Sequence, residues 1–324
     1  MKLNKIIAEG KKNTGKVIPT GIQRLDNIIK GLHIGHVHTL GARPVMGKTA
    51  FVATMVRNIG LFYKVPLAVL SLEQTEQLMA ERIWAAEFGW DNNGLPDNPL
   101  QIESGMEPEL KSAIARLRAV GFDDPLRRKT EYQRMMNEAP VWIEHDYFLS
   151  MDEVISRMER QRKTNNVRLI IIDGLDYIDV GTKMLEQAQS MLKLVQAAER
   201  LQVAVLLTSG LNRDVENRVG HRPMLANLRG GFCAEAYSSM VMFIFRPEYY
   251  GIEEDVYGST AGMAEFTIAK NSLGSIGHII LNFAGKARFE DAEQPTPLLS
   301  SYEIVPSRMN NDKYDILEGP DVPF

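Results

Sequence analysis

The sequence predicts an α/β protein with a mainly parallel central sheet flanked by helices. Three apolar runs support this fold class, at residues 66–71, 168–172 and 203–208, and segments with helical periodicity separate them. Continuous apolar runs that alternate with helices are typical of parallel strands buried on both faces. Because ligands bind where the carboxyl ends of such strands meet, we expect the functional site at that edge of the sheet.

The octapeptide ARPVMGKT occupies residues 42–49, between an apolar run at residues 36–40 and a helix-like segment that begins at Thr49. A strand-to-helix turn can bind phosphate, because the first amide groups of the helix point at the anion. Gly47 allows close approach of the backbone, Lys48 supplies a charge for the β- and γ-phosphates, and the Thr49 hydroxyl can ligate Mg²⁺. Gly-Lys-Thr can also begin an ordinary helix, but the full setting predicts a site for a nucleoside triphosphate with magnesium. The expected nucleotide-binding residues are Ala42, Arg43, Pro44, Met46, Gly47, Lys48, Thr49 and Ala50.

Polar and acidic residues follow the other predicted strands at the edge that carries Lys48. Asp173 comes directly after residues 168–172 and is the expected partner of Thr49 at the metal. An aspartate at a strand end can also cap the next element, and only the combination with Lys48 and Thr49 favours the metal role. Glu73 follows residues 66–71 and lies at the same edge.

Further strands are predicted after these. Residues 240–245 form another apolar run, and residues 264–270 and 276–283 follow as two strands joined by a short polar turn. A turn of this kind between two strands predicts a C-terminal β-hairpin.

The composition is that of an ordinary globular protein: 324 residues, 44% hydrophobic and 24% charged, with a net charge of −4. No apolar run approaches the roughly 20 residues needed to cross a bilayer, and no signal-peptide core follows the first residues, so we expect a cytoplasmic protein without membrane contact. The single cysteine, Cys233, excludes an intramolecular disulfide and a cysteine-cluster metal site. Any nucleic-acid contact must come from local basic loops or from several subunits acting together.

The chain divides into a core and two tails. Residues 1–16 are polar and rich in lysine, which indicates a solvated tail or an arm that binds DNA or links subunits. Residues 17–290 contain all of the predicted strands. Residues 291–324 are rich in proline and are expected to form a loosely ordered tail.

Residues 88–140 differ from the rest of the core. The segment is turn-rich at residues 91–99, helical around residues 107–120 and basic at residues 127–129. We interpret it as a mostly helical insertion, whose basic triplet is a solvated helix face rather than a DNA contact.

The form Ala-Arg-Pro-x-Met-Gly-Lys-Thr closely resembles the phosphate-binding loop of DnaB-type replicative helicases, the hexameric RecA-like motors of bacterial and phage DNA replication. Pro44 and Met46 are seldom found together in other loops of this kind, and Ala42 stands where the general pattern has glycine. The resemblance spans about residues 17–290 and implies a RecA-like P-loop NTPase. The family's helical amino-terminal collar domain has no counterpart in it, so we expect the motor domain alone.

The resemblance also implies roles for further residues. Residues 71–74 resemble the family's Ser-Leu-Glu-Met, whose glutamate polarises the attacking water, although Glu73 could instead favour a helix dipole. Lys270 keeps the lysine that reaches from the hairpin into the neighbouring subunit's nucleotide. The expected catalytic residues are therefore Glu73, Lys48 and Lys270. Two segments near residue 222 and residue 229 resemble the channel loop that holds single-stranded DNA, and the expected DNA contacts are Arg222, Arg229, Gly230 and Gly231.

Three positions depart from the family pattern. Gly210 stands in place of a glutamine that senses the γ-phosphate, Ser272 in place of an arginine finger, and Gly230 in place of a glutamate of the DNA loop. An arginine finger contributes roughly 10³ to 10⁵ in rate where it has been measured.

The sequence thus predicts an ATP-dependent DNA helicase-like motor of DNA replication. It would be a homo-oligomer, a hexameric ring, with ATP and Mg²⁺ at subunit boundaries and single-stranded DNA in its channel, and other replication proteins are further candidate partners. The alternative is a RecA-like ATP-binding scaffold or accessory protein with weak or no hydrolysis. A third interpretation, a recombinase or circadian-clock type of ATPase, fits the fold but not the octapeptide.

Overall fold

The computed structural model describes residues 17–88, 125–218, 220–229, 231–255, 258–284 and 287–292. The predicted tails at residues 1–16 and beyond residue 292, the predicted helix around residues 107–120, and Gly230 lie outside these ranges. The basic triplet at residues 127–129 belongs to a helix, but its side chains are outside the described part of the structure.

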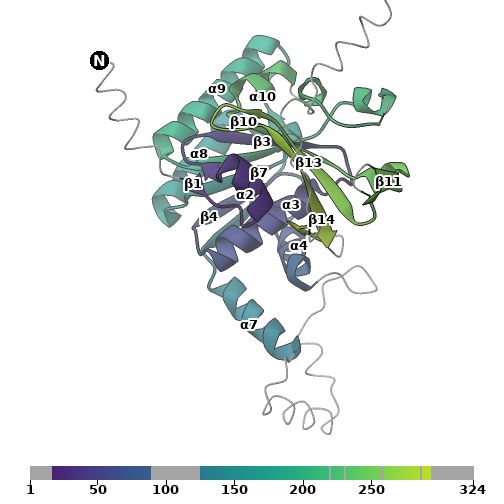
Figure 1. Ribbon diagram of the computed structural model, residues 1–324. Helices are drawn as coiled ribbons and strands as arrows, with labels where there is room; N and C mark the ends of the chain where they lie inside the picture. The colour runs from purple at the N-terminus through teal and green to yellow at the C-terminus, as the bar shows by residue number, and fades with distance from the viewer. Residues whose placement is uncertain are drawn as a thin grey trace, which may run out of the picture.

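Within the described ranges, a nine-stranded sheet forms the centre of the molecule, in the order β15-β14-β13-β10-β3-β9-β7-β4-β5 (Figure 1). The parallel strands are β10 (Met240–Phe245), β3 (Val37–Ala42), β9 (Ala204–Ser209), β7 (Leu169–Asp173), β4 (Leu67–Ser71) and β5 (Val141–His145). The antiparallel strands are β13 (Met263–Asn271), β14 (Gly277–Ala284) and β15 (Arg288–Asp291). The predicted mainly parallel sheet with a C-terminal hairpin is confirmed.

The parallel strands are apolar because helices cover both faces of the sheet. Every residue of β3, β4, β7, β9 and β10 is buried. Alternate residues of a strand enter opposite cores: Leu169 and Ile171 of β7 pack into one hydrophobic cluster, and Ile170 and Ile172 into the other. The edge strand β5 is only partly buried, and the sequence did not predict it.

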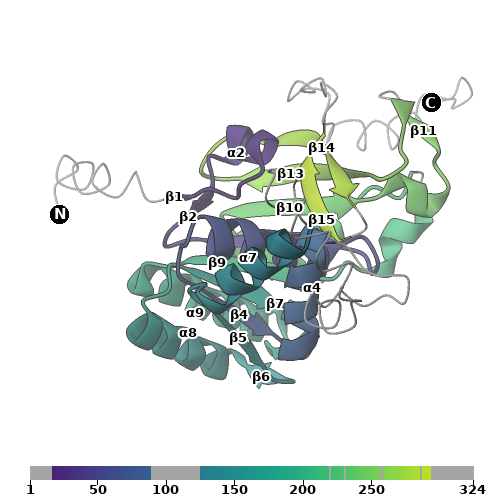
Figure 2. The same ribbon diagram turned by 90° about the horizontal axis from the view of Figure 1, so that it is seen from below.

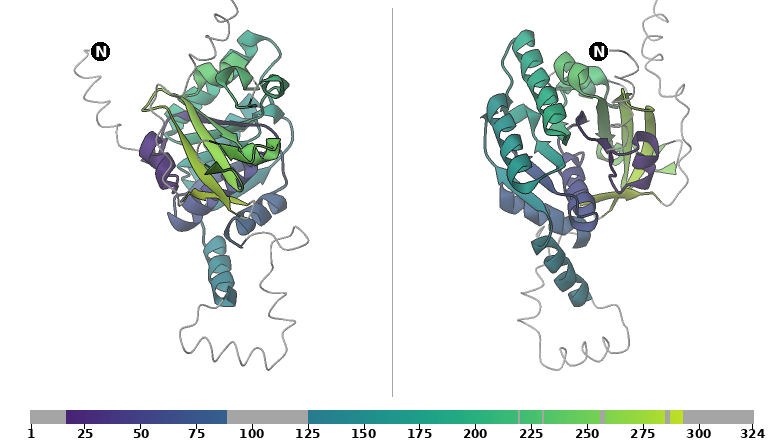
Figure 3. Two further views of the ribbon diagram at one scale, coloured as in Figure 1. Left: turned by 45° about the vertical axis from the view of Figure 1, so that its right-hand side comes forward. Right: turned by 90° about the vertical axis from the view of Figure 1, so that its left-hand side faces the viewer.

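Seven α-helices lie in the described ranges: α2 (Gln23–Ile29), α3 (Lys48–Met55), α4 (Glu76–Phe88), α7 (Pro125–Asn137), α8 (Met151–Asn165), α9 (Met184–Leu201) and α10 (Gly231–Tyr237). Side chains of α8, α9 and α10 build one core, and those of α2, α3 and α4 build the other. Figure 2 and the right-hand view of Figure 3 show α8 and α9 side by side on one side of the sheet. Helix α7 projects from the rest of the molecule in Figure 1.

Short paired strands complete the description: β1 (Val17–Ile18) with β2 (Leu32–His33), β6 (Leu149–Ser150) with β8 (Ile178–Asp179), and β11 (Glu254–Asp255) with β12 (Gly258–Ser259). None of the helices in the described ranges is both long enough and apolar enough to cross a membrane.

Candidate active site

The phosphate-binding loop joins the end of β3 to the start of α3, as the octapeptide predicts. Gly47 has a φ of 99° and Val45 a φ of 70°, both in the left-handed region, so the loop turns sharply before the helix. Met46 is buried and holds the loop onto the core. A Cβ on Gly47 would lie 2.7 Å from Cζ of Phe289 on β15, which means that both backbone and space require glycine here.

We expect Gly47→Ala to lower the free energy of unfolding by about 1–3 kcal/mol, because it combines left-handed strain with the Phe289 contact. Gly251→Ala is the matched control: φ is 69° at Gly251, but a Cβ there would have no neighbour within 4 Å. Chemical denaturation of the nucleotide-free variants measures both effects. Equal losses for the two substitutions would show that the Phe289 contact contributes nothing.

Lys48, the first residue of α3, forms an ion pair with Glu73 in the loop that follows β4. Its Nζ lies 3.2 Å from Oε2 of Glu73. Burial opposes the charge of Lys48, but the carboxylates of Asp173, Glu73 and Asp176 outweigh it and raise the lysine's pKa. Lys48 therefore stays positively charged in a largely enclosed site, which is the state that binds triphosphate oxygens.

Asp173, the last residue of β7, is fully buried. Its Oδ1 accepts a hydrogen bond of 2.7 Å from Oγ1 of Thr208 on β9, whereas its Oδ2 is buried without a hydrogen-bond partner among the described residues. Burial raises the pKa of this carboxyl, and the charge of Lys48 opposes the rise. A buried carboxylate oxygen without a partner requires an explanation.

A magnesium ion fits this arrangement. Mg²⁺ prefers oxygen ligands and is commonly bound by one or two protein groups together with substrate phosphates and water. Oδ2 of Asp173 and the Thr49 hydroxyl, on the second residue of α3, are oxygen donors of that kind. No group of three or more His, Cys, Asp or Glu side chains able to hold a metal occurs in the described part of the chain. The donors therefore suit a metal that arrives with a nucleotide.

The remaining loop residues have structural contacts. Arg43 donates from Nε to Oε1 of Glu216 at 2.7 Å and from Nη1 to the Leu211 carbonyl at 3.0 Å. The sequence predicts that Arg43 binds nucleotide, but Glu216 could not be identified from it as the partner of this side chain. Ala42 and Ala50 are buried beside the loop, and Pro44 is exposed.

The structure separates the two arginines expected to contact DNA. Arg229 is exposed, with its Nη1 3.6 Å from Oδ2 of Asp176. Arg222 instead donates from Nε and Nη2 to the buried carboxylate of Glu265 on β13, at 2.8 and 2.5 Å. Gly231 is the first residue of α10. Arg229 thus faces a carboxylate in the turn after β7, whereas Arg222 is held by a carboxylate of β13.

Lys270 lies at the opposite edge of the sheet from the phosphate-binding loop of its own chain. It pairs with Val241 near the start of β10, and β10 begins beside the start of β3. Its Nζ donates to the carbonyl oxygens of Glu235 and Ala236 at the end of α10, at 2.6 and 3.2 Å. Ser272, two residues further on, is exposed on the hairpin. Any contact of Lys270 with a nucleotide must therefore involve another chain's site.

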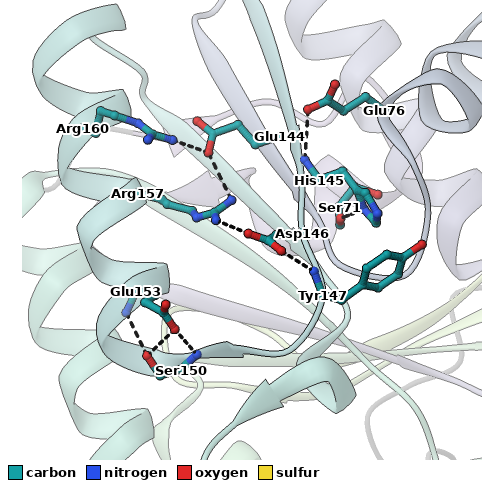
Figure 4. Close-up of polar contacts among 10 residues, drawn as sticks. All are labelled: Ser71, Glu76, Glu144, His145, Asp146, Tyr147, Ser150, Glu153, Arg157 and Arg160. Atoms are coloured by element: carbon teal, nitrogen blue, oxygen red, sulfur yellow. Dashed lines mark hydrogen bonds and ion pairs between the residues drawn. The ribbon is translucent and has the colours of Figure 1, made fainter.

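The sequence also did not reveal the loop that follows β5, beside the loop of Glu73. The His145 ring donates from Nδ1 to the Ser71 carbonyl at 2.7 Å, and its amide donates to Oε1 of Glu76 (Figure 4). Asp146 accepts from Arg157 of α8, which fixes the other side of the loop. The β-branched and aromatic residues Val141, Trp142 and Ile143 were the available signal for this strand.

This geometry defines the class: a P-loop nucleoside triphosphatase with a RecA-like fold. A solved ATPase domain of another protein superposes with a TM-score of 0.69 at 22% identity, covering 90% of this chain and 97% of that one. A DnaB-like replicative helicase, solved in a study of its interactions with primase, gives the same TM-score at 23% identity, over 90% of this chain and 66% of that one. At these identities the likeness shows the fold.

The chain belongs to the family of DnaB-like helicase C-terminal domains, whose model matches residues 17–291. The replicative DNA helicase DnaB of Buchnera aphidicola subsp. Baizongia pistaciae (strain Bp) is 30% identical over 281 residues, which are 85% of this chain and 55% of the relative. The chain spans a little over half the length of the curated relatives that it matches.

Proposed function

We propose that the chain is an ATP-dependent DNA helicase motor that acts in DNA replication. The curated relatives are replicative DNA helicases, and the chain matches the family model over its whole core. The observation that carries the proposal is the convergence of Lys48, Glu73 and Asp173 at one edge of the parallel sheet. That set of charges suits a bound ATP with magnesium and a water poised for attack.

Different residues of the chain have different roles in hydrolysis. Lys48 neutralises charge on the β- and γ-phosphates, while Thr49 and Asp173 would hold the magnesium ion, which would neutralise further charge. Phosphate oxygens compete with Glu73 for Lys48, so nucleotide binding releases the Glu73 carboxylate to orient the attacking water. Glu73 accepts a proton from the attacking water as the water oxygen bonds to the γ-phosphorus and the bond to the bridging oxygen breaks, and ADP and phosphate leave.

The proposal extends to assembly and to DNA. The position of Lys270, at the edge away from its own loop, supports a homo-oligomer in which one subunit's hairpin approaches the next subunit's nucleotide. A hexameric ring of this kind would hold single-stranded DNA in its channel at Arg229 and the glycines beside it. The primase named with one solved helicase makes other replication proteins candidate partners.

We expect single-stranded DNA to stimulate ATP hydrolysis by the purified chain. Steady-state phosphate release is measured with Mg²⁺, with and without oligo(dT), beside a strand-separation assay on a forked duplex. Hydrolysis that is unaffected by DNA, together with no strand separation, would overturn the motor and leave the ATP-binding scaffold. Tight ATP binding without turnover would lead to the same conclusion.

A further inference from the structure

Asp176 lies between the nucleotide site and the segment that carries Arg229. It belongs to a short 3₁₀ turn, Leu175–Tyr177, that follows β7, and Gly174 makes the turn with a φ of 126°. Its Oδ2 accepts the Gly210 amide at 3.0 Å and lies 3.6 Å from Nη1 of Arg229. One carboxylate oxygen therefore holds both the end of β9 and the exposed guanidinium.

The backbone around Arg229 is joined to the end of β9. The Arg229 amide donates to the Gly210 carbonyl at 2.9 Å, and the Ser209 hydroxyl donates to the Arg229 carbonyl at 3.0 Å. Leu211 and Leu228 form an isolated bridge next to these bonds. A displacement of Asp176 or of Gly210 is thus transmitted directly to Arg229.

Gly210 and Asp176 are a matched pair. A Cβ on Gly210 would lie 2.5 Å from Oδ2 of Asp176, too close for any side chain while the carboxylate accepts the Gly210 amide. A glutamine at position 210 would therefore displace Asp176 rather than simply add a sensor. Glycine is therefore required at position 210, because the carboxylate of Asp176 occupies the space that a side chain would take.

The same residue is linked to the nucleotide side of the site. Asp173 precedes Asp176 by three residues and is bonded through Thr208 to β9, the strand that ends at Ser209. Asp176 is also one of the carboxylates whose charge acts on Lys48. The bond from Thr208 to Asp173 and the bond from the Gly210 amide to Asp176 therefore connect the nucleotide edge of β9 with Arg229.

We propose that Asp176 is a positioning residue that links nucleotide binding at the edge of Asp173 to nucleic-acid binding at Arg229. A nucleotide bound beside Asp173 fixes the end of β9 through Thr208, which orders the Gly210 amide on the Asp176 carboxylate and tightens the Asp176–Arg229 pair. This inference rests on the proposed function only in its last step, where Arg229 contacts DNA. The upstream step, from nucleotide to Gly210 and Arg229, can be measured separately without DNA.

Hydrogen exchange of the full chain tests the upstream step with Mg²⁺ and AMP-PNP and without DNA. The amides of Gly210 and Arg229 should exchange more slowly when AMP-PNP is bound. Asp176→Asn keeps an oxygen for the Gly210 amide but removes the charge, so it should abolish this nucleotide dependence. Asp152→Asn is the matched control: it removes an exposed carboxylate that pairs with Lys193 of α9, and it should behave as the wild type.

Binding of oligo(dT) tests the downstream step. The ratio of its dissociation constants with ADP and with AMP-PNP should differ from one by about two- to fivefold in the wild type, the range that an exposed ion pair supplies. In Asp176→Asn the ratio should return to one. A purely structural role for Asp176 would weaken binding equally with both nucleotides and leave the ratio unchanged.

A double-mutant cycle locates the link. Gly210→Ala should remove the nucleotide-dependent protection, because its Cβ pushes the carboxylate away, and Asp176→Ala should partly restore the Arg229 backbone in the double variant. Strict additivity of the two substitutions would overturn the pairing. The proposed link would also be overturned if hydrogen exchange at Gly210 and Arg229 in the wild type did not depend on nucleotide, whatever the DNA results. Nucleotide-dependent exchange without any binding of oligo(dT) would instead sustain the link and overturn the proposed DNA motor.

Discussion

Lys48→Ala is expected to reduce ATP hydrolysis by about 10²- to 10³-fold, the loss typical of a preorganised charge at a reacting phosphate or carbonyl. Lys48 pairs with Glu73 in the nucleotide-free protein, its charge also acts on Asp173, and its side chain is only 14% exposed. Its removal leaves these carboxylates to repel the triphosphate, so ATP binding should weaken together with turnover. Phosphate release and calorimetric titration with ATP and Mg²⁺ measure the two losses.

The control for Lys48→Ala is Lys193→Ala, which removes an exposed lysine paired with Asp152 on the surface of α8. It should leave both measurements at wild-type values. Thermal unfolding of each variant with and without nucleotide separates a lost site from a lost fold, because only a protein that binds ATP is stabilised by it. A folded Lys48→Ala protein with normal turnover would refute the assignment of the phosphate site.

Glu73→Gln should have the opposite profile, with turnover reduced by about 10²- to 10⁴-fold and ATP binding retained. Glutamine preserves the length of the side chain and an oxygen that can accept from Lys48, but it cannot serve as a base for the attacking water. Single-turnover measurements with excess enzyme place the loss in the chemical step.

Glu76→Gln is the matched control for that prediction. Glu76 is the first residue of α4, three residues after Glu73, and its carboxylate accepts the His145 amide rather than a hydrogen bond from Lys48. Should Glu76→Gln abolish turnover while Glu73→Gln preserves it, the base would be Glu76 and the loop after β4 would be assigned wrongly.

The parts of the fold that the sequence predicted are those whose burial is complete. β4 and β7 have no exposed residue, and their side chains are apolar up to the last residue of each strand, Ser71 and Asp173, which marks the ligand edge. β5 lies at the edge of the sheet and carries Glu144, which pairs with Arg157 and Arg160 of α8, so its pattern is broken by charge. Partial burial is therefore the reason that the sequence did not predict β5.

The site was predictable where neighbouring residues in the chain create it, and not where distant residues do. The octapeptide at residues 42–49 specifies its own turn, and Lys48 and Thr49 follow from it. Nothing near Gly210 in the sequence indicates that Asp176, 34 positions earlier, accepts its amide. Because that contact exists only in the folded chain, Gly210 looked like the loss of a side chain instead of one member of a pair.

The contact between the phosphate-binding loop and β15 has a consequence for the order of synthesis. Phe289 packs against Gly47, and its amide donates to the Thr54 hydroxyl of α3, 235 residues earlier in the chain. On the ribosome the octapeptide emerges long before the strand that supports it. Until β15 has been synthesised, the phosphate-binding loop and α3 therefore lack the contacts that Phe289 supplies.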